Sequence, residues 1–320
     1  MKLLLTGGAG FIGSCFTRMA VSGELNLELS DITVLDALTY SGNLKNLDTA
    51  LNEVEFINGN ICDSKLVEKL VEKNDVIINF AAESHVDRSI ESSKEFATTN
   101  FMGVQVLCDA IKKYGINRYI QISTDEVYGS VKNGYSKETD VLEPNSPYSA
   151  TKASADLLIY SYINTYKLPI IITRSSNNYG PYQNYEKLIP TVISSLSNNR
   201  KIPIYGNGQN LRNWIHVRDN CSAISKLVSQ GESGEIYNIS GKTEISNLDL
   251  VKIILTYMDR DESCIEFVQD RKGHDFRYAI DNSKLIKKIG QQSEIDFMQG
   301  LKETIDWYLA NQEWLVKNYY

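Results

Sequence analysis

Two short runs of polar residues contain the side chains that acid–base chemistry on a small substrate needs. Tyr148 and Lys152 occur in the run Tyr-Ser-Ala-Thr-Lys, so on a helix they project from the same face. An ammonium group beside a phenol lowers the pKa of the phenol, which then acts as a base near neutral pH. Surface helices also show this spacing by chance, so the elements around the pair decide its meaning.

The second run is Ser-Thr-Asp-Glu-Val-Tyr-Gly at 123–129, directly after an apolar segment. If that segment is a strand, the polar side chains emerge at the carboxyl edge of a sheet, where open α/β sheets bind ligands. Asp125 and Glu126 then provide one acid and one base, as the elimination of water requires. The alternative is that both acids cap the next helix or face solvent.

A glycine-rich run, Thr-Gly-Gly-Ala-Gly-Phe-Ile-Gly at 6–13, links the first predicted strand to the first predicted helix. Glycines allow the backbone to approach a pyrophosphate closely, and the helix N-terminus supplies N–H donors. Asp36 ends the second predicted strand, where a carboxylate holds the adenosine ribose hydroxyls and repels a 2′-phosphate. The run therefore predicts NAD as cofactor, and a glycine turn with a surface aspartate is the competing interpretation.

Strands and helices alternate around these motifs. Apolar and β-branched runs predict strands at 2–6, 32–36, 54–58, 75–80, 118–123 and 169–174. Helical patterns follow at 11–22, at 64–73 with Ser64 as N-cap, at 95–114 and at 149–167. The alternation predicts an α/β fold, a Rossmann-type doubly wound parallel sheet with right-handed crossovers.

The pattern loosens after residue 175, where prolines and glycines become frequent. We expect helices at 186–199, 218–229, 246–259 and 297–310, and a packed helix with a frayed end from Trp307 to Tyr320. The chain is thus expected to form an NAD-binding domain, 1–174, and a smaller mixed α/β substrate domain, 175–320. The boundary is approximate, and some later segments are expected to return to the first domain.

Composition narrows the classes of function. The chain has 320 residues and a net charge of −7, without a basic cluster, so we expect no nucleic-acid partner. No apolar run has the length of a membrane span, and the first residues do not fit a signal peptide, so we expect a cytoplasmic protein without a membrane partner. The five cysteines are scattered without a CxxC pair, which predicts no disulfide framework and no metal site.

With these motifs in order, the chain resembles the extended short-chain dehydrogenase/reductase superfamily, and within it the nucleotide-diphosphate-glucose 4,6-dehydratases. The resemblance covers nearly the whole chain. It is carried by the stretches 36–44, 79–89, 123–129, 145–153, 174–181, 187–190, 211–214 and 270–275. The pair Asp125-Glu126 is the most specific detail, because related epimerases generally lack it and related decarboxylases have no aspartate there.

The resemblance implies a hydro-lyase that dehydrates dTDP-glucose to dTDP-4-keto-6-deoxyglucose. Tyr148, helped by Thr124 and Lys152, removes the C4 hydroxyl proton while hydride passes to bound NAD. Glu126 then removes the C5 proton, Asp125 protonates the departing C6 hydroxyl, and hydride returns to C6. Two carboxyl groups are needed for this sequence, whereas simple dehydrogenation needs only Tyr148 and Lys152.

The resemblance also implies the binding residues. Cofactor contacts are expected from Gly7, Gly10, Phe11, Ile12, Gly13, Asp36, Thr39, Asn43, Ile61, Phe80, Ala81, Ala82, Ser84, Thr99, Tyr148 and Lys152. Substrate contacts are expected from Ser84, His85, Thr124, Asn177, Lys187, Leu188, Tyr205, Arg212, Asn238, Arg271 and His274. Without the family, Arg212 and Arg271 are typical surface residues and His85 is an ordinary structural histidine.

Alternatives remain at this stage. Ser175, Tyr185, Asn213 and Lys272 differ from the residues frequent in the family near the nucleotide pocket, so both dTDP and UDP stay open as the nucleotide. A UDP-sugar 4,6-dehydratase, an epimerase or a decarboxylase on the same scaffold is the second hypothesis, and a catalytically silent NAD-binding regulator is the third. The helices near 100–114 and 152–166 form a homodimer interface in the superfamily, although their pattern fits burial within one monomer equally well.

Overall fold

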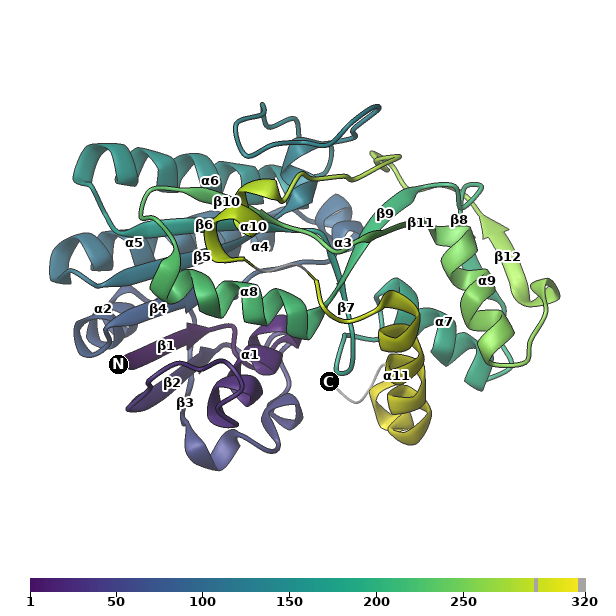
Figure 1. Cartoon of the computed structure of the whole chain (residues 1–320), viewed down its shortest axis with the longest axis horizontal. Coiled ribbons are helices and arrows are strands. Elements are labelled where there is room, and N and C mark those ends of the chain that lie inside the picture. Colours follow the sequence, from purple (N-terminus) through teal and green to yellow (C-terminus); the bar gives the residue numbers. More distant parts are fainter. Residues whose placement is uncertain (291–292, 316–320) are drawn as a thin grey trace.

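A computed structural model describes residues 1–290 and 293–315 of the chain (Figure 1). Its main sheet has seven parallel strands in the order β10-β6-β5-β4-β1-β2-β3. These strands are β1 (Lys2–Thr6), β2 (Asp31–Asp36), β3 (Glu55–Asn58), β4 (Val76–Asn79), β5 (Arg118–Thr124), β6 (Ile170–Ser175) and β10 (Ile236–Ile239). The order reverses direction between β1 and β4, and open α/β sheets bind ligands at such a switch point.

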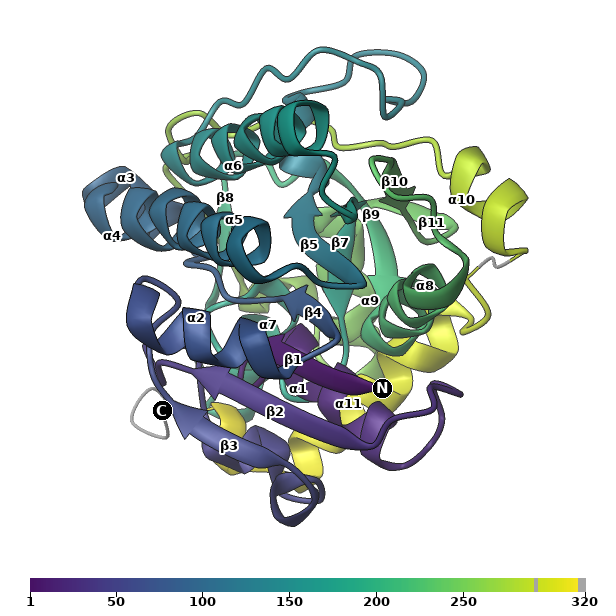
Figure 2. The ribbon, with the colours of Figure 1, turned by 90° about the vertical axis from the view of Figure 1, so that its left-hand side faces the viewer.

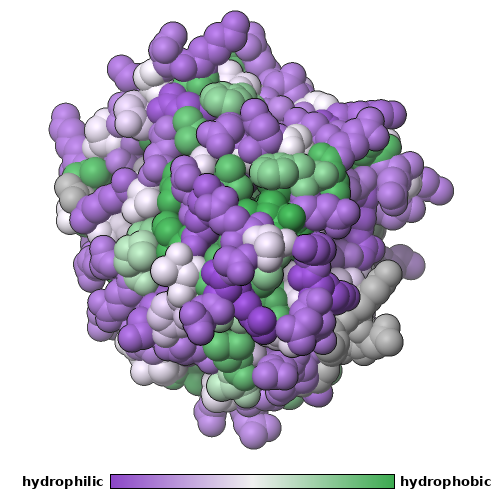
Figure 3. Space-filling model, turned by 90° about the vertical axis from the view of Figure 1, so that its right-hand side faces the viewer, coloured by the Kyte–Doolittle hydropathy of each residue, from purple (hydrophilic) through white to green (hydrophobic). Residues whose placement is uncertain are grey.

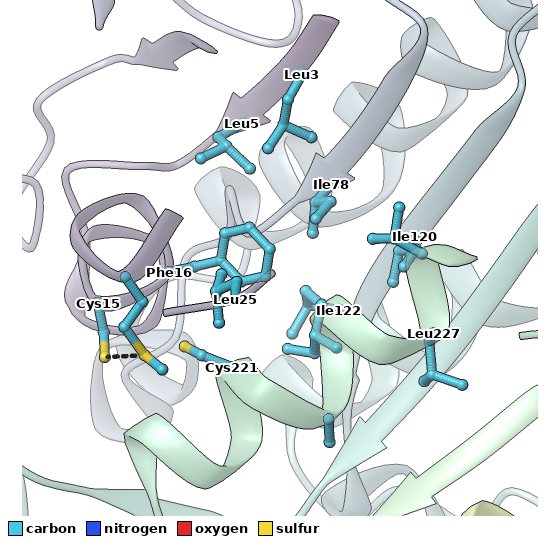
Figure 4. Packing of buried hydrophobic residues seen from close by; sticks show 14 of the residues in the cluster. Leu3, Leu5, Cys15, Phe16, Leu25, Ile78, Ile120, Ile122, Cys221 and Leu227 are labelled. Carbon is cyan, nitrogen blue, oxygen red and sulfur yellow. Dashed lines mark hydrogen bonds between the residues drawn. The ribbon is translucent and has the colours of Figure 1, made fainter. Parts of the chain in front are cut away.

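Helices cover both faces of this sheet (Figure 2). One face packs on α1 (Phe11–Val21), α8 (Val217–Gln230) and α10 (Ser283–Ile289), and the other on α2 (Ser64–Lys73), α5 (Gly103–Tyr114) and α6 (Pro147–Tyr166). Strand side chains alternate between the two layers, so Leu3 and Leu5 enter one core and Leu4 enters the other. Figure 4 shows the first core, with Phe16 of α1 between the strands and α8. The predicted doubly wound fold is confirmed.

The later residues build a second, smaller lobe beside the carboxyl ends of the main strands (Figure 1). Its sheets are β11-β9-β7 and β12-β8, formed by β7 (Asn177–Tyr179), β8 (Ile202–Tyr205), β9 (Leu211–His216), β11 (Thr243–Ser246) and β12 (Ile265–Val268). Helices α7 (Leu188–Ser197), α9 (Asn247–Tyr257) and α11 (Phe297–Ala310) pack around them. Polar side chains cover most of the outer face of this lobe (Figure 3).

Most predicted elements are present, and one predicted helix cap is wrong. Asp63, not Ser64, caps α2, because its carboxylate accepts hydrogen bonds from Lys65 N and Leu66 N, each at 3.1 Å. The helix expected at 95–114 is confirmed: residues 94–114 are helical without a break, as α4 (Lys94–Phe96), a π-helical turn (Ala97–Met102) and α5. Helix α3 (Val86–Glu91) follows a polar loop and has no counterpart among the predicted helices.

The C-terminal part of the chain packs into the core of the second lobe. The predicted helix at 297–310 is confirmed as α11, and a short 3-10 turn, η6 (Gln312–Leu315), follows it. Trp314 and Leu315 of this turn are buried, whereas the rest of the expected frayed end, 316–320, lies outside the described residues. In the part of the chain that the structure describes, none of the helices has the length and apolar character needed to cross a membrane.

Candidate active site

A pocket opens at the carboxyl ends of β1, β2, β4 and β5, and the glycine-rich loop forms its floor. Gly7 has a positive φ of 70°, and a Cβ atom there would lie 2.4 Å from the backbone N of Ala81. A Cβ atom at Gly13 would lie 2.3 Å from the Gly7 carbonyl oxygen. The close approach of the loop to α1 and to the end of β4 therefore requires glycine at both positions.

Asp36 ends β2 at the edge of this first pocket. Its two carboxylate oxygens accept hydrogen bonds from Leu38 N at 2.8 Å and from Ala9 N at 2.9 Å. Burial raises the pKa of Asp36, and the two backbone hydrogen bonds oppose this rise. The carboxylate is thus fixed against the glycine-rich loop with lone pairs left for ribose hydroxyls, which suits a dinucleotide without a 2′-phosphate.

The structure brings together nearly all residues predicted for the cofactor. Those that line the first pocket are Gly7, Gly10, Phe11, Ile12, Gly13, Asp36, Thr39, Ile61, Phe80, Ala81, Ala82, Ser84, Thr99, Tyr148 and Lys152. Asn43 is the exception. It lies behind the glycine-rich loop, where its backbone N donates to Ala9 O at 3.1 Å and its side chain accepts from Lys45 N at 3.0 Å.

The five predicted catalytic residues reach the same pocket from three elements. Thr124 ends β5, and Asp125 and Glu126 follow in a single 3-10 turn, Asp125–Tyr128. Tyr148 and Lys152 lie in the first turns of α6. Pro147 occupies the first position of that helix, and the Ser146 side chain caps it by accepting from Ser149 N at 3.1 Å, so the helix start is firmly placed.

Neighbouring charges give the two carboxyl groups different acid–base properties. Burial and the neighbouring Glu126 raise the pKa of Asp125 to about 8, so its carboxyl group holds a proton at neutral pH. Burial also raises the pKa of Glu126, but Lys187, Arg212 and Arg271 oppose this rise. Asp125 is therefore suited to donate a proton, and Glu126, held among cations, to accept one.

The phenol of Tyr148 does not have the lowered pKa that its pairing with Lys152 predicted. The Lys152 Nζ donates to the Ile122 carbonyl oxygen at 2.5 Å, and burial lowers the pKa of Lys152 to about 8 while Asp156 opposes that change. Burial and Glu126 raise the pKa of Tyr148 well above its usual range, and a hydrogen bond with Thr124 opposes the rise. The expected lowering of the phenol pKa by Lys152 is thus wrong for these side-chain positions, because burial dominates.

A second pocket adjoins the first and extends between the two lobes. Of the residues predicted for the substrate, it is lined by His85, Asn177, Lys187, Leu188, Tyr205, Arg212, Arg271 and His274, while Ser84 and Thr124 line the first pocket. Glu126, Asn177 and Lys187 line both pockets. The carboxyl group of Glu126 therefore lies where the two pockets meet.

Asn238 lines neither pocket. It is fully buried on β10, where its side chain accepts from the Tyr128 hydroxyl at 2.9 Å and donates to the carbonyl oxygens of Ser136 at 3.0 Å and Asp281 at 3.1 Å. The predicted substrate contact of Asn238 does not fit this position, because its side chain is fully buried and hydrogen-bonded within the protein.

Three cationic side chains give the second pocket its charge. The Lys187 Nζ donates to Ser84 O at 2.8 Å, and the Arg212 guanidinium donates to Asp275 O at 2.9 Å. Arg271 donates to the Asp87 carboxylate at 2.9 Å. Two guanidinium groups and an ammonium around one pocket suit a diphosphate, because guanidinium donors pair with two oxygens at once.

Sequence reasoning missed several lining residues. Asn178 and Gln183 line both pockets, and Asp87 and Tyr278 line the second. The Tyr278 hydroxyl donates to Asp275 at 2.8 Å. The polar run Asn-Asn-Tyr-Gly-Pro after β6 is the sequence feature that could have indicated Asn178 and Gln183. The described residues include no group of three or more histidine, cysteine or acidic side chains placed to bind a metal ion.

Comparison with known proteins agrees with this geometry. The family model described as GDP-mannose 4,6 dehydratase matches residues 4–304. A dTDP-glucose 4,6-dehydratase from Actinoplanes is 45% identical over 98% of this chain and 99% of its own length. The chain belongs to the dTDP-glucose 4,6-dehydratase family. It is also 49% identical to the low-salt glycan biosynthesis protein Agl12 of Haloferax volcanii, over 98% of this chain and all of that protein.

The solved structures give the same result for the fold. The dTDP-glucose 4,6-dehydratase DesIV from Streptomyces venezuelae, with NAD and TYD bound, superposes with a TM-score of 0.97 and is 44% identical over 98% of both chains. A dTDP-glucose 4,6-dehydratase from Bacillus anthracis, in complex with NAD, has a TM-score of 0.90 at 44% identity. Membership of the dTDP-glucose 4,6-dehydratase family makes this chain an NAD-dependent hydro-lyase by descent.

Proposed function

We propose that this protein dehydrates dTDP-glucose to dTDP-4-keto-6-deoxyglucose with NAD held in the first pocket. The observation that supports this most is the position of Asp125 and Glu126 in the same pocket as Tyr148 and Lys152. A dehydrogenase or epimerase needs only the phenol and the ammonium group. The added pair of carboxyl groups supports elimination of water as a further step.

The residues divide the reaction between them. NAD supplies the hydride acceptor for C4, the hydride donor for C6 and a positive charge that favours a deprotonated phenol. Tyr148 takes the proton of the C4 hydroxyl, and Thr124, hydrogen-bonded to the phenol, stabilises the phenolate. Lys152 lies one turn after Tyr148 on the same face of α6, and its ammonium group donates to the Ile122 carbonyl oxygen. From this fixed position it orients the ribose of the cofactor and the phenol.

Elimination then uses the two carboxyl groups in different protonation states. The 4-keto group acidifies the proton at C5, and Glu126 accepts it. Asp125, whose pKa of about 8 keeps it protonated at neutral pH, donates a proton to the departing C6 hydroxyl. Asp125 is buried and Glu126 is partly buried, so little water reaches the two carboxyl groups and the charge interactions during the step are strengthened.

The second pocket supports a nucleoside diphosphate as the part of the substrate that binds. Lys187, Arg212 and Arg271 supply the positive charge for two phosphates, and Tyr205 and Leu188 offer apolar surface for a base. The relatives named for dTDP-glucose favour thymine as this base. A UDP-sugar substrate is the alternative, because no contact in the pocket by itself distinguishes the two pyrimidines.

A substrate panel tests the proposal. The purified protein is incubated separately with dTDP-glucose and UDP-glucose, and the alkali-induced absorbance of a 4-keto sugar is followed together with product mass. The proposal expects a product lighter than the substrate by one water, formed faster from dTDP-glucose. A product of unchanged mass would indicate an epimerase, and absence of turnover with retained NAD would indicate a binding protein.

We further propose that the protein is a cytoplasmic homodimer. Helices α5 and α6 lie side by side, and Leu157 and Tyr160 of α6 are 62% and 53% exposed, as is Met102 before α5 at 48%. Exposed apolar side chains on two adjacent helices favour a helical interface with a second copy. The free cysteines, three of them buried, are typical of a reducing compartment.

A further inference from the structure

The C-terminal turn contacts the glycine-rich loop through a chain of hydrogen bonds. The Trp314 indole Nε1 donates to Asn46 Oδ1 at 3.1 Å, and Asn46 Nδ2 donates to Ala9 O at 2.9 Å. Ala9 is the central residue of the loop, and its own N donates to Asp36 at 2.9 Å. These hydrogen bonds form one line from Trp314 through Asn46 and Ala9 to Asp36, the carboxylate predicted to bind the cofactor.

This line holds the loop from both sides. Asp36 fixes the peptide N–H of Ala9, while Asn46 Nδ2 and the backbone N of Asn43 both donate to the Ala9 carbonyl. Asn46 is 1% exposed and Trp314 4% exposed, so water does not compete for these hydrogen bonds. Gly10 and Phe11, which follow Ala9 and line the first pocket, are thus held in place before a pyrophosphate binds, and preorganised donors bind an anion most tightly.

The same turn also reaches the segment that lines both pockets. Tyr182, at a positive φ of 69°, packs against Trp307 with ring centroids 4.4 Å apart and against Trp314 at 5.5 Å. Arg18 of α1 lies 3.9 Å above the Tyr182 ring and donates to the Asn46 carbonyl oxygen. This aromatic cluster, Tyr182, Trp307 and Trp314, therefore packs against the cofactor side and the substrate side together.

We propose that Asn46 and Trp314 are positioning residues for the cofactor: through them the C-terminal turn clamps the glycine-rich loop and slows the release of NAD. The inference rests on the proposed function only through its cofactor. It gives the clamp a purpose, because the reaction uses the cofactor twice in each turnover. A cofactor that left between the two hydride transfers would strand the sugar as a 4-keto intermediate.

Two variants break the line at different points. Trp314→Phe keeps an aromatic ring in the cluster but removes the N–H that Asn46 accepts. Asn46→Asp keeps an acceptor for Trp314 but replaces the donor to Ala9 O by a carboxylate oxygen. Trp307→Phe is the matched control, because it makes the same change in the same aromatic cluster, whereas the indole that reaches Asn46 is that of Trp314.

The readout is exchange of bound NAD for isotope-labelled NAD, measured on the whole chain without sugar substrate, together with the melting temperature of the NAD-free form. We expect Trp314→Phe and Asn46→Asp to speed exchange by about fivefold to tenfold, the effect of one lost hydrogen bond. Trp307→Phe is expected to exchange at the wild-type rate, even where it lowers the melting temperature as much as Trp314→Phe.

Exchange in both line-breaking variants at the wild-type rate would overturn the proposal. Equal acceleration in Trp307→Phe would also overturn it, since the effect would then belong to aromatic packing in general. The test needs only NAD, so it stands even if dTDP-glucose is not the substrate. A wild-type chain that takes up no NAD would instead refute the proposed function.

Discussion

The buried carboxyl of Asp125 makes an unusual combination of stability and activity effects predictable. Its pKa of about 8, against an ordinary 3.8, means that the folded protein keeps a proton that the unfolded chain releases above pH 4. Below the unfolded pKa both the folded and the unfolded chain hold this proton, so Asp125 does not reduce the free energy of unfolding. Above it only the folded chain holds the proton, and the free energy of unfolding falls as the pH rises towards 8. The amide introduced by Asp125→Asn has the shape of the protonated acid and carries no such cost.

The magnitude follows from the distance between the two pKa values. At pH 7 the solution is about three pH units above the unfolded pKa of Asp125. At about 1.4 kcal/mol for each unit, the protonation of Asp125 in the folded chain lowers the free energy of unfolding by at most about 4 kcal/mol. We expect Asp125→Asn to gain stability over the wild type progressively as the pH rises from about 5 to about 8, with a gain of at most about 4 kcal/mol at pH 7. The same variant should lose dehydration by about 100-fold or more, because an amide cannot donate the proton that the C6 hydroxyl needs.

The assay is urea unfolding of the NAD-free protein at a series of pH values. The slope of the free energy of unfolding against urea concentration is compared between the two proteins as a check on two-state behaviour. Glu53→Gln, which removes an exposed carboxyl, is the control for the loss of one negative charge. A variant whose stability difference from the wild type stays constant across the pH range would refute the assignment of a raised pKa to Asp125. Destabilisation at pH 8 would refute it as well.

Three further outcomes are expected. Glu126→Gln should bind NAD and substrate while slowing the exchange of C5 deuterium with solvent by about 100-fold, and unchanged exchange would remove Glu126 from its role as base. Gly13→Ala should weaken NAD binding and cost about 1–3 kcal/mol of stability in calorimetry, because its Cβ would lie 2.3 Å from Gly7 O; unaltered binding would contradict the account of the loop. Leu157→Glu should shift a dimer to monomer in sedimentation, since it puts a charge on the exposed α6 face, and a dimer that persists would place the interface elsewhere.

The parts of the fold that follow a local rule were predictable. Periodic apolar runs located the six strands from β1 to β6, and the strand–helix alternation fixed their parallel arrangement. The glycine-rich loop and the Tyr148–Lys152 pair were recognised from the spacing of their residues within the predicted strands and helices. The edge strand β10 was not identified, because its four residues, Ile236–Ile239, form too short an apolar run and include an asparagine.

Several site features depended on packing that the sequence does not state. Asn238 resembled a substrate residue by its place in the chain, yet its amide completes a buried network with Tyr128. The pKa values of Tyr148 and Lys152 follow from burial, which spacing alone cannot reveal. The link from Trp314 to the glycine loop joins residues 268 positions apart, so only the folded chain shows it.

The central claim is that one pocket carries redox and elimination chemistry on a single hexose. The most direct test uses dTDP-glucose labelled with deuterium at C4 and locates the label in the product by mass and magnetic resonance. The account predicts deuterium at C6 of a product that has lost one water, and solvent hydrogen at C5. Deuterium that remains at C4, or that is lost to solvent, would contradict it.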